Sequence, residues 1–478
     1  MSDLSTPKPN AAEALPGLDA RGEVPPQLLA NRLLLVPELL LLGDGPVRDH
    51  ALVVSGATIE AVGKADRLIA GNPQLAPIRL PRRLLMPGFI DSHTHLAQAF
   101  GKALAFGEPS EIYRRIWVPL EGSLDESRLR MSARLAALEA LRGGFTTVCD
   151  AGARAAGDVS AIAEETARVG VRCVLGLVCN DLGADAPGPR EAIRQRAERH
   201  LARWQGDALV QPSLAISIPE AASDRMLHDV SRLSAEAGVT FQTHANEHLA
   251  AVERSLVQCG LRPIEHLQRV GALGPQTLVA HATLVTPREL RMLRDHGAAV
   301  AYNPVASAWK GNAVAPALLM SEMGIRVGLG TDGTRSDAFR LLDAAETAQL
   351  LTHGLGRGDM ECGDGSLWLH QALQGGADVL RMAPALGTLA PGGKADMLIV
   401  DLDVPELCPS WDLSWELVRY ADRGQIDAVF VDGRLRLWRG WPVDWDARAF
   451  LGELSEQIAR FVRGASFQKV RTSRADPA

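Results

Sequence analysis

The sequence predicts an α/β fold: a (β/α)8 barrel of the TIM type with a small β-sandwich built from both ends of the chain. Three observations support this prediction. Eight short apolar runs alternate with stretches of helical periodicity in the middle of the chain. Strand-like runs without such helices flank this region on both sides. The length of 478 residues exceeds one ordinary domain but suits a barrel with an accessory module.

The runs that predict the eight barrel strands are short and rich in apolar residues. They are residues 84–93, 145–152, 171–180, 208–217, 239–247, 277–285, 298–307 and 326–333. Candidates for amphipathic helices lie between most of them, at residues 125–142, 190–204, 222–237, 287–296 and 337–353. Strands that alternate with helices in this way favour a parallel sheet closed into a barrel.

The β-sandwich is predicted from strand-like runs before and after the barrel, with turn signals such as SGAT and VDGR. These runs are residues 32–42, 51–62, 392–403 and 425–440. The predicted domains are a flexible leader at 1–28, a sandwich at 29–82 plus 384–445, the barrel at 83–383, and a C-terminal helix and tail at 446–478.

The composition argues against several classes of protein. The chain has 57 acidic and 50 basic residues, so its net charge of −7 gives no reason to expect nucleic acid or an anionic membrane as partner. No apolar run reaches the ~20 residues of a membrane span, and the first residues lack the order of a signal peptide. Six scattered cysteines without a CxxC pair favour reduced thiols. We therefore expect a soluble, cytoplasmic protein.

Four histidines and one aspartate occupy the carboxyl ends of predicted barrel strands. His93 and His95 are two residues apart, so on a strand both side chains point the same way. His244, His281 and Asp332 each end another strand-like run. Barrel enzymes place their active sites at this end. Imidazoles with a carboxylate suit zinc, iron or a similar divalent ion, which would activate water at neutral pH.

Glu247 follows His244 by three residues, at the rim where the predicted strand gives way to a loop. In a hydrolase, such a carboxylate can take a proton from water and deliver it to the leaving group or a ring nitrogen. Alternatively, Glu247 is a carboxylate near the N-terminus of the helix that follows, where the helix dipole favours negative charge. We favour the catalytic role.

Taken together, these motifs resemble the amidohydrolase superfamily over about residues 34–440. The motifs are PGFIDSHTH, HxxE from His244, GTDG around Asp332 and GTLAPGGKADMLIVD in the C-terminal segment. The resemblance implies that His93, His95, His244 and Asp332 hold one metal ion. It further implies that His281 hydrogen-bonds water or substrate and that Asp332 also accepts a proton.

The resemblance points to the mononuclear branch that includes guanine, cytosine, S-adenosylhomocysteine and triazine aminohydrolases and chlorohydrolases. No lysine stands between Lys102 and Lys310, which excludes the carboxylated lysine that bridges two metals in other members, although Glu220 remains a candidate bridging carboxylate. We therefore expect a hydrolytic deaminase of an aminated N-heterocycle, with one divalent ion, most simply zinc, that releases ammonia. The alternatives are a triazine-like chlorohydrolase or cyclic amide hydrolase with the same site, or a scaffold without activity.

Five residues are candidates for substrate binding. Gln98 matches the position of an amide that hydrogen-bonds the heterocycle in guanine deaminase-like members. Ser213 stands where those members carry Arg and where nucleoside deaminases carry His. Tyr113 and Trp117 could stack on a flat ring, although core packing is equally compatible. Asn303 belongs to the Asn-Pro motif. The expected partner is a small heterocyclic substrate, and the expected assembly is a homo-oligomer, with a dimer favoured.

Overall fold

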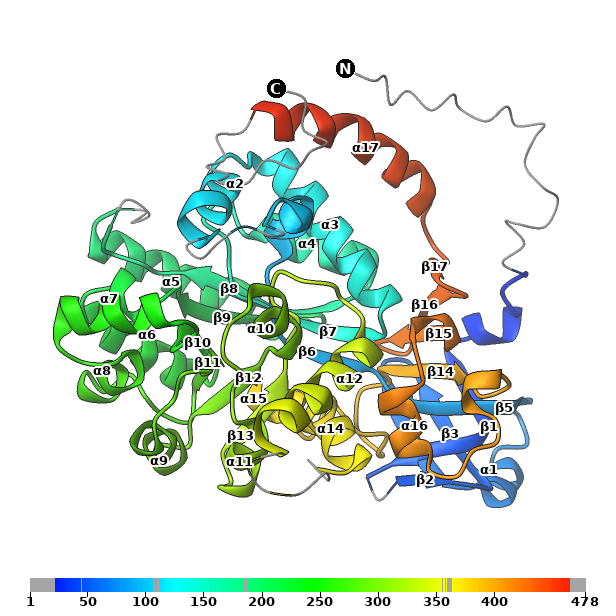
Figure 1. Cartoon of the computed structure of the whole chain (residues 1–478). Helices are drawn as coiled ribbons and strands as arrows, with labels where there is room; N and C mark the ends of the chain where they lie inside the picture. Colours follow the sequence, from blue (N-terminus) through cyan, green and yellow to red (C-terminus); the bar gives the residue numbers. More distant parts are fainter. Residues whose placement is uncertain are drawn as a thin grey trace, which may run out of the picture.

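The computed structural model describes residues 22–464 except 44, 106–107, 109–111, 156, 184–187, 355, 357 and 359–362. Its centre is a ring of eight parallel strands in chain order, one in each predicted run (Figure 1). They are β6 (Phe89–Thr94), β7 (Phe145–Asp150), β8 (Arg172–Val178), β9 (Val210–Ile216), β10 (Phe241–Ala245), β11 (Thr277–His281), β12 (Ala299–Tyr302) and β13 (Arg326–Leu329).

The ring closes between its last and first strands through a few specific contacts instead of a full ladder. Thr94 and Asp332 form an isolated parallel bridge, and the Asp332 amide donates to the His93 carbonyl at 2.8 Å. Below them the buried Asp91 carboxylate accepts from the amide and hydroxyl of Thr331 at 3.0 and 2.5 Å. This seam therefore joins β6 directly to the loop that follows β13.

The predicted helices are present, with ends set by local capping. They are α3 (Glu126–Arg142), α5 (Arg190–Trp204), α6 (Asp224–Ala237), α9 (Pro287–Asp295) and α12 (Ala338–Gln349). Asp125 and Ser223 cap α3 and α6, because their side chains accept from backbone amides in the first turn. The last predicted helix continues past α12 as a π-helical turn, Leu350–Gly354.

Additional helices complete the fold around the ring and beside the small sheet. They are α1 (Ala65–Gly71), α2 (Val118–Gly122), α4 (Ser160–Val169), α7 (Leu249–Cys259), α8 (Pro263–Arg269), α10 (Pro304–Lys310), α11 (Ala317–Glu322), α14 (Gly365–Ala372), α15 (Gln374–Val379), α16 (Leu413–Arg419) and α17 (Ala447–Gly464). None of the described helices is long and apolar enough to cross a membrane.

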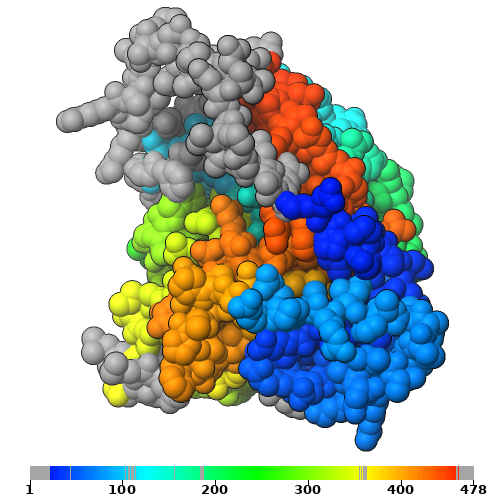
Figure 2. Space-filling model, turned by 90° about the vertical axis from the view of Figure 1, so that its right-hand side faces the viewer, coloured from blue at the N-terminus to red at the C-terminus, as the bar shows by residue number. Residues whose placement is uncertain are grey.

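Both ends of the chain build one nine-stranded mixed sheet beside the barrel, in the order β17-β16-β15-β14-β5-β1-β3-β4, with β2 paired to β1. Its strands are β1 (Arg32–Leu42), β2 (Gly45–Val47), β3 (His50–Ser55), β4 (Thr58–Lys64), β5 (Pro77–Pro87), β14 (Met397–Asp401), β15 (Ile426–Val431), β16 (Arg434–Trp438) and β17 (Trp441–Pro442). Figure 2 shows the N-terminal (blue) and C-terminal (orange) segments side by side. The predicted fold class is confirmed.

The passage from this sheet into the barrel occurs at Gly88. The predicted run at 84–93 is divided there, because its first part completes β5 and its second part is β6. A Cβ on Gly88 would lie 2.1 Å from the Thr146 side chain, so only glycine fits. The small sheet therefore extends beyond the predicted domain boundary at residue 83.

Both predicted terminal segments are partly described. Pro26–Leu29 form a 3-10 turn whose Leu28 is buried in the core of the small sheet, while residues 1–21 of the predicted leader lie outside the described residues. The C-terminal helix α17 lies over α3 (Figure 1), where Arg128 and Arg134 of α3 stack on Phe461 and Phe450 of α17.

Candidate active site

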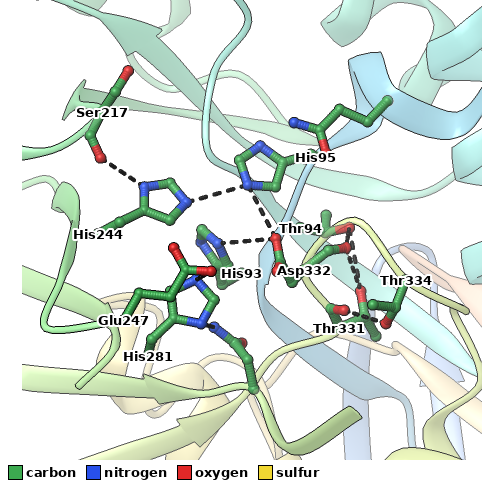
Figure 3. A network of polar contacts seen from close by, with 12 residues as sticks. His93, Thr94, His95, Ser217, His244, Glu247, His281, Thr331, Asp332 and Thr334 are labelled. Carbon is green, nitrogen blue, oxygen red and sulfur yellow. Dashed lines mark hydrogen bonds and ion pairs between the residues drawn. The ribbon is translucent and has the colours of Figure 1, made fainter. Parts of the chain in front are cut away.

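The four histidines and Asp332 meet at the carboxyl end of the barrel, as the strand positions predict. The Nε2 atom of His95 lies 3.2 Å from both Nε2 of His244 and Oδ1 of Asp332. His93 places its Nε2 at 3.8 Å from the same aspartate oxygen. Figure 3 shows these side chains turned toward one another, with His281 and Glu247 beside them.

The backbone is strained where strands deliver these side chains. His281 and Asp332 have φ values of 74° and 56°, in the left-handed region that non-glycine residues seldom adopt. Such conformations cost about 1–3 kcal/mol each and concentrate at functional sites, where surrounding contacts hold them. For Asp332, the seam contact with the His93 carbonyl supplies one such contact.

Hydrogen bonds fix the orientation of two imidazole rings. The Nδ1–H of His244 donates to the Ser217 carbonyl at 2.7 Å, so its Nε2 lone pair faces His95. The Asn303 amide donates to Nδ1 of His281 at 3.2 Å, which leaves the proton of the neutral ring on Nε2. A backbone carbonyl behind a histidine is a common support for a metal-binding imidazole.

The cluster has the donor set of a divalent metal site. The buried Nε2 atoms of His93 and His281 have no hydrogen-bond partner among the described residues, although buried polar atoms are normally satisfied. Ligand atoms of His93, His95 and Asp332 lie within 4.8 Å of one another, as do those of His93, His244 and His281. Neutral imidazoles with a carboxylate are suitable ligands for a zinc-like ion, and these residues fit one.

Glu247 lies at the edge of this cluster because the chain turns sharply after β10. Asn246 adopts a left-handed φ of 55°, which asparagine tolerates, and donates its amide to Glu289 at 2.8 Å. The Thr283 hydroxyl donates to the carbonyl of Glu247 at 2.6 Å. The Glu247 carboxylate then lies 3.9 Å from Nε2 of His281.

Lys310, at the end of α10, joins the two carboxylates of the site and was missed by the sequence analysis. Its Nζ lies 2.8 Å from Oε1 of Glu247 and 2.7 Å from Oδ2 of Asp332. The only signal available was its rarity, since the chain has six lysines. The seven residues between the end of β12 and Lys310 do not reveal that α10 brings the side chain back to Glu247 and Asp332.

The charges in this buried site are strongly coupled. Burial alone would raise the pKa of Glu247 and of Asp332, but the Lys310 ammonium outweighs it and holds both pKa values below their usual range. Burial lowers the pKa of His244 to about 3 and that of His93 well below its ordinary value. The carboxylates are therefore ionised and both rings neutral, as metal ligation requires.

A cavity of about 280 Å³ opens beside the cluster. Three of the predicted substrate-binding residues line it: Gln98, Tyr113 and Trp117. The Gln98 amide is held by Glu121 at 2.7 Å, and Arg154 lies over the Tyr113 ring at 4.7 Å. The same Glu121 carboxylate pairs with Arg154 at 2.9 Å, a buried network that the sequence did not reveal.

The other two predicted substrate-binding residues do not line this cavity. Ser213, inside β9, accepts a hydrogen bond from the Gln242 side chain at 2.8 Å, and Asn303 stands behind His281. Glu220, the candidate metal bridge, lines the cavity but belongs to none of the potential metal-ligand clusters among the described residues.

The comparison with known families agrees with this geometry. Residues 84–436 match the sequence model of the amidohydrolase family, and this segment contains every residue of the cluster. The chain belongs to the amidohydrolase family. It is accordingly a hydrolase, and a divalent metal fits its histidine and aspartate cluster.

Two amidohydrolases that are similar to this chain are named as deaminases. A 5-methylthioadenosine/S-adenosylhomocysteine deaminase from Syntrophobacter fumaroxidans is 30% identical over 408 residues, 84% of this chain and 92% of that protein. A 5'-deoxyadenosine deaminase from Methanopyrus kandleri is also 30% identical, over 78% of this chain and 85% of the relative.

Solved structures share the fold at lower sequence identity. A zinc-bound adenosine deaminase from Xanthomonas campestris is 24% identical with a TM-score of 0.82, over 90% of this chain and 98% of that one. An atrazine chlorohydrolase from Arthrobacter aurescens, in complex with zinc and atraton, is 22% identical with a TM-score of 0.78, over 89% of this chain and all of that one.

Proposed function

We propose that this amidohydrolase is a hydrolytic deaminase of an aminated N-heterocycle and uses one zinc ion held by His93, His95, His244 and Asp332. The observation that supports it is the convergence of these four side chains with Glu247 and His281 in one cluster beside the cavity. Glu220 lies outside the ligand clusters, which favours a single ion.

The reaction adds one water to the ring carbon that bears the amino group and releases one ammonia. A divalent ion bound by the four ligands would supply the activation of water at neutral pH. Glu247, ionised beside Lys310 in the free enzyme, accepts a proton at its carboxylate and returns it to a ring nitrogen or to the departing amine. The Nε2–H of His281 points toward the same region and donates to the oxygen or ring atom that becomes negative.

Ammonia is favoured as the leaving group over chloride. The relatives at 30% identity are named as deaminases, whereas the likeness to the chlorohydrolase is one of fold. Those relatives act, by their names, on adenosine derivatives. Ser213 stands where nucleoside deaminases carry His, but it lies outside the cavity, so this difference does not argue against such substrates. We therefore place 6-aminopurine nucleosides first among the substrates to test.

The deciding experiment is metal analysis of the purified protein followed by a screen for ammonia release from aminopurines, aminopyrimidines, pterins and triazines. We expect close to one zinc per chain, loss of turnover on chelation, and ammonia from an aminated heterocycle. Two ions per chain that are both needed for full activity would overturn the mononuclear assignment. Release of chloride or of a new carboxylate, without ammonia, would overturn the deaminase assignment.

A homodimer in the cytoplasm is also part of this proposal. Light scattering of the purified protein at several concentrations measures the assembly directly, and a monomer throughout would contradict it.

A further inference from the structure

Glu220 is a buried carboxylate in the cavity wall that the reaction does not use. It lies in the 3-10 turn Pro219–Ala221 directly after β9, and its side chain is 5% exposed. Its Oε1 atom has no hydrogen-bond partner among the described residues. A buried acceptor normally has a donor, because leaving it without one costs about 1–3 kcal/mol.

The Glu220 carboxylate accepts a hydrogen bond from its own backbone amide, so part of this side chain supports the turn. Its backbone is held by other contacts: the Ala221 amide donates to the Ile218 carbonyl at 2.9 Å, and the Gln258 side chain donates to the Glu220 carbonyl at 3.1 Å. Burial raises the pKa of the Glu220 carboxyl, so the fold places this group at a cost. The Oε1 atom gains no hydrogen bond from these contacts, and a buried polar atom placed at such a cost indicates a functional role.

Glu220 also lies apart from the reaction centre. The charged neighbours that influence it are Arg254, His266 and His248, on or beside α7 and α8, and none of them is a proposed metal ligand. Nε of Arg254 is 3.9 Å from Oε1 of Glu220, too far for a hydrogen bond. The cavity wall on this side therefore presents a carboxylate oxygen without a hydrogen-bond donor among the described residues.

This carboxylate selects the chemistry of what it contacts. It repels an anionic group, whereas a hydroxyl can donate a hydrogen bond to it. The same cavity is lined by Tyr113 and Trp117, whose rings suit a flat heterocycle. An uncharged, hydroxyl-bearing substituent on that heterocycle would lie beside Glu220.

We propose that Glu220 is a specificity-determining residue that accepts hydrogen bonds from hydroxyl groups of a sugar-like substituent on the heterocycle. This inference rests on the proposed function and narrows it from aminated heterocycles in general to glycosylated ones. Glu220 thus selects the substrate while His244, Glu247 and Asp332 carry the reaction.

The test compares two probes on the zinc-loaded full-length enzyme: adenosine, and 9-methyladenine, which has the same ring without hydroxyl groups. We expect the parent to prefer adenosine. Glu220→Gln should lower kcat/KM for adenosine by about 10- to 100-fold, mainly through KM, as for a lost hydrogen bond to a charged group. For 9-methyladenine it should change kcat/KM by less than about threefold.

Glu253→Gln is the matched control, because this exposed glutamate next to Arg254 undergoes the same chemical change outside the cavity. Metal content and melting temperature are measured for every variant. If Glu220→Gln is unstable, Glu220→Asp keeps the charge, withdraws it by one methylene, and should show the same selective loss for adenosine.

The possible failures are distinguishable. If the parent releases ammonia from heterocycles without hydroxyl groups and not from their glycosylated forms, the inference about Glu220 is wrong while the proposed function stands. Equal losses for both probes in Glu220→Gln would also overturn it, since a merely structural role predicts them. No ammonia from any heterocycle would overturn the proposed function itself.

Discussion

Buried polar groups have hydrogen-bond partners at the barrel's junction with the small sheet but lack them at its carboxyl-end rim. At the junction, Arg172 of β8 donates from Nε and Nη2 to the two oxygens of Asp396, both at 3.1 Å, and also pairs with Asp432 at 3.3 Å. At the rim, the Nε2 atoms of His93 and His281 are equally buried and have no hydrogen-bond partner among the described residues.

The difference separates residues that stabilise from residues that act. A buried ion pair with complete hydrogen bonding keeps two parts of a fold in register, and removing one partner exposes the full desolvation cost of the other. Unsatisfied polar atoms at a strand end are instead available to a ligand. Substitutions in the two regions should therefore separate loss of activity from loss of stability.

The largest effect is expected at the rim. His93→Ala removes a proposed metal ligand, so metal content should fall and kcat/KM should drop by several orders of magnitude, because water activation depends on the ion. Metal analysis and ammonia assays measure both. The control His370→Ala changes an exposed histidine and should keep both values. A His93→Ala enzyme with parental metal content and turnover would remove His93 from the ligand set.

At the junction we expect a loss of stability whose free energy is comparable to that of the activity lost at the rim. Asp396→Ala leaves the Arg172 guanidinium buried without its main partner, which should lower the free energy of unfolding by about 3–5 kcal/mol. The folded fraction should keep its activity per bound metal. The control Asp403→Ala breaks the exposed pair with Arg82 and should cost about 1 kcal/mol or less. Equal costs in urea titrations would show that burial does not distinguish the two pairs.

Glu247→Gln should reduce kcat by about 100-fold or more, the usual range for general acid–base catalysis, while metal content stays near that of the parent. In free energy of activation this is about 2.7 kcal/mol or more. Kinetics and metal analysis of the same preparation provide the measurement. Near-parental turnover would reassign the proton transfer to Asp332 or His281, and loss of the ion would make Glu247 a ligand.

The smallest effect concerns a buried histidine remote from the site. His200 of α5 donates from Nε2 to the Leu175 carbonyl at 3.1 Å, and burial lowers its pKa to about 4. Between pH 6.5 and 4 the unfolded chain then binds more protons than the folded one. Stability should fall as the pH drops through this window, by about 2 kcal/mol from this residue between pH 7 and pH 5.

Urea titrations at pH 7 and pH 5 measure this dependence. His200→Gln removes the titrating group and should flatten the decline, whereas the exposed His228→Gln should keep it. An unchanged slope in His200→Gln would assign the acid sensitivity to other groups.

Much of the fold and of the metal cluster was predictable because strand ends are visible in the sequence. Each ligand closes a short apolar run, and parallel strands of a barrel bring such ends together without any need for loop geometry. Residues 77–83 were not predicted as a strand, since prolines and arginines interrupt the alternation of β5, and residues 84–87 were assigned to the barrel.

Residues placed by loops and long-range pairs were beyond prediction. The reach of Lys310 depends on how α10 folds back, and the pair of Glu121 and Arg154 joins segments far apart in the chain. Ser213 was chosen from its place in a motif. The register of β9 instead puts its hydroxyl against Gln242, and Ser217 at the end of the same segment supports His244.

The seam of the barrel has a consequence for how this protein can fail. His93 belongs to the first strand of the ring, His95 follows that strand, and Asp332 lies in the loop after the last strand. The Asp332 amide donates a hydrogen bond to the His93 carbonyl across the join. An ion bound by these side chains would link the first strand of the ring to the loop after the last strand. Ring closure and chemistry then depend on one set of atoms. A barrel that opens at this join therefore loses all of its activity instead of a fraction. A partly damaged sample would accordingly contain fully active and inactive molecules.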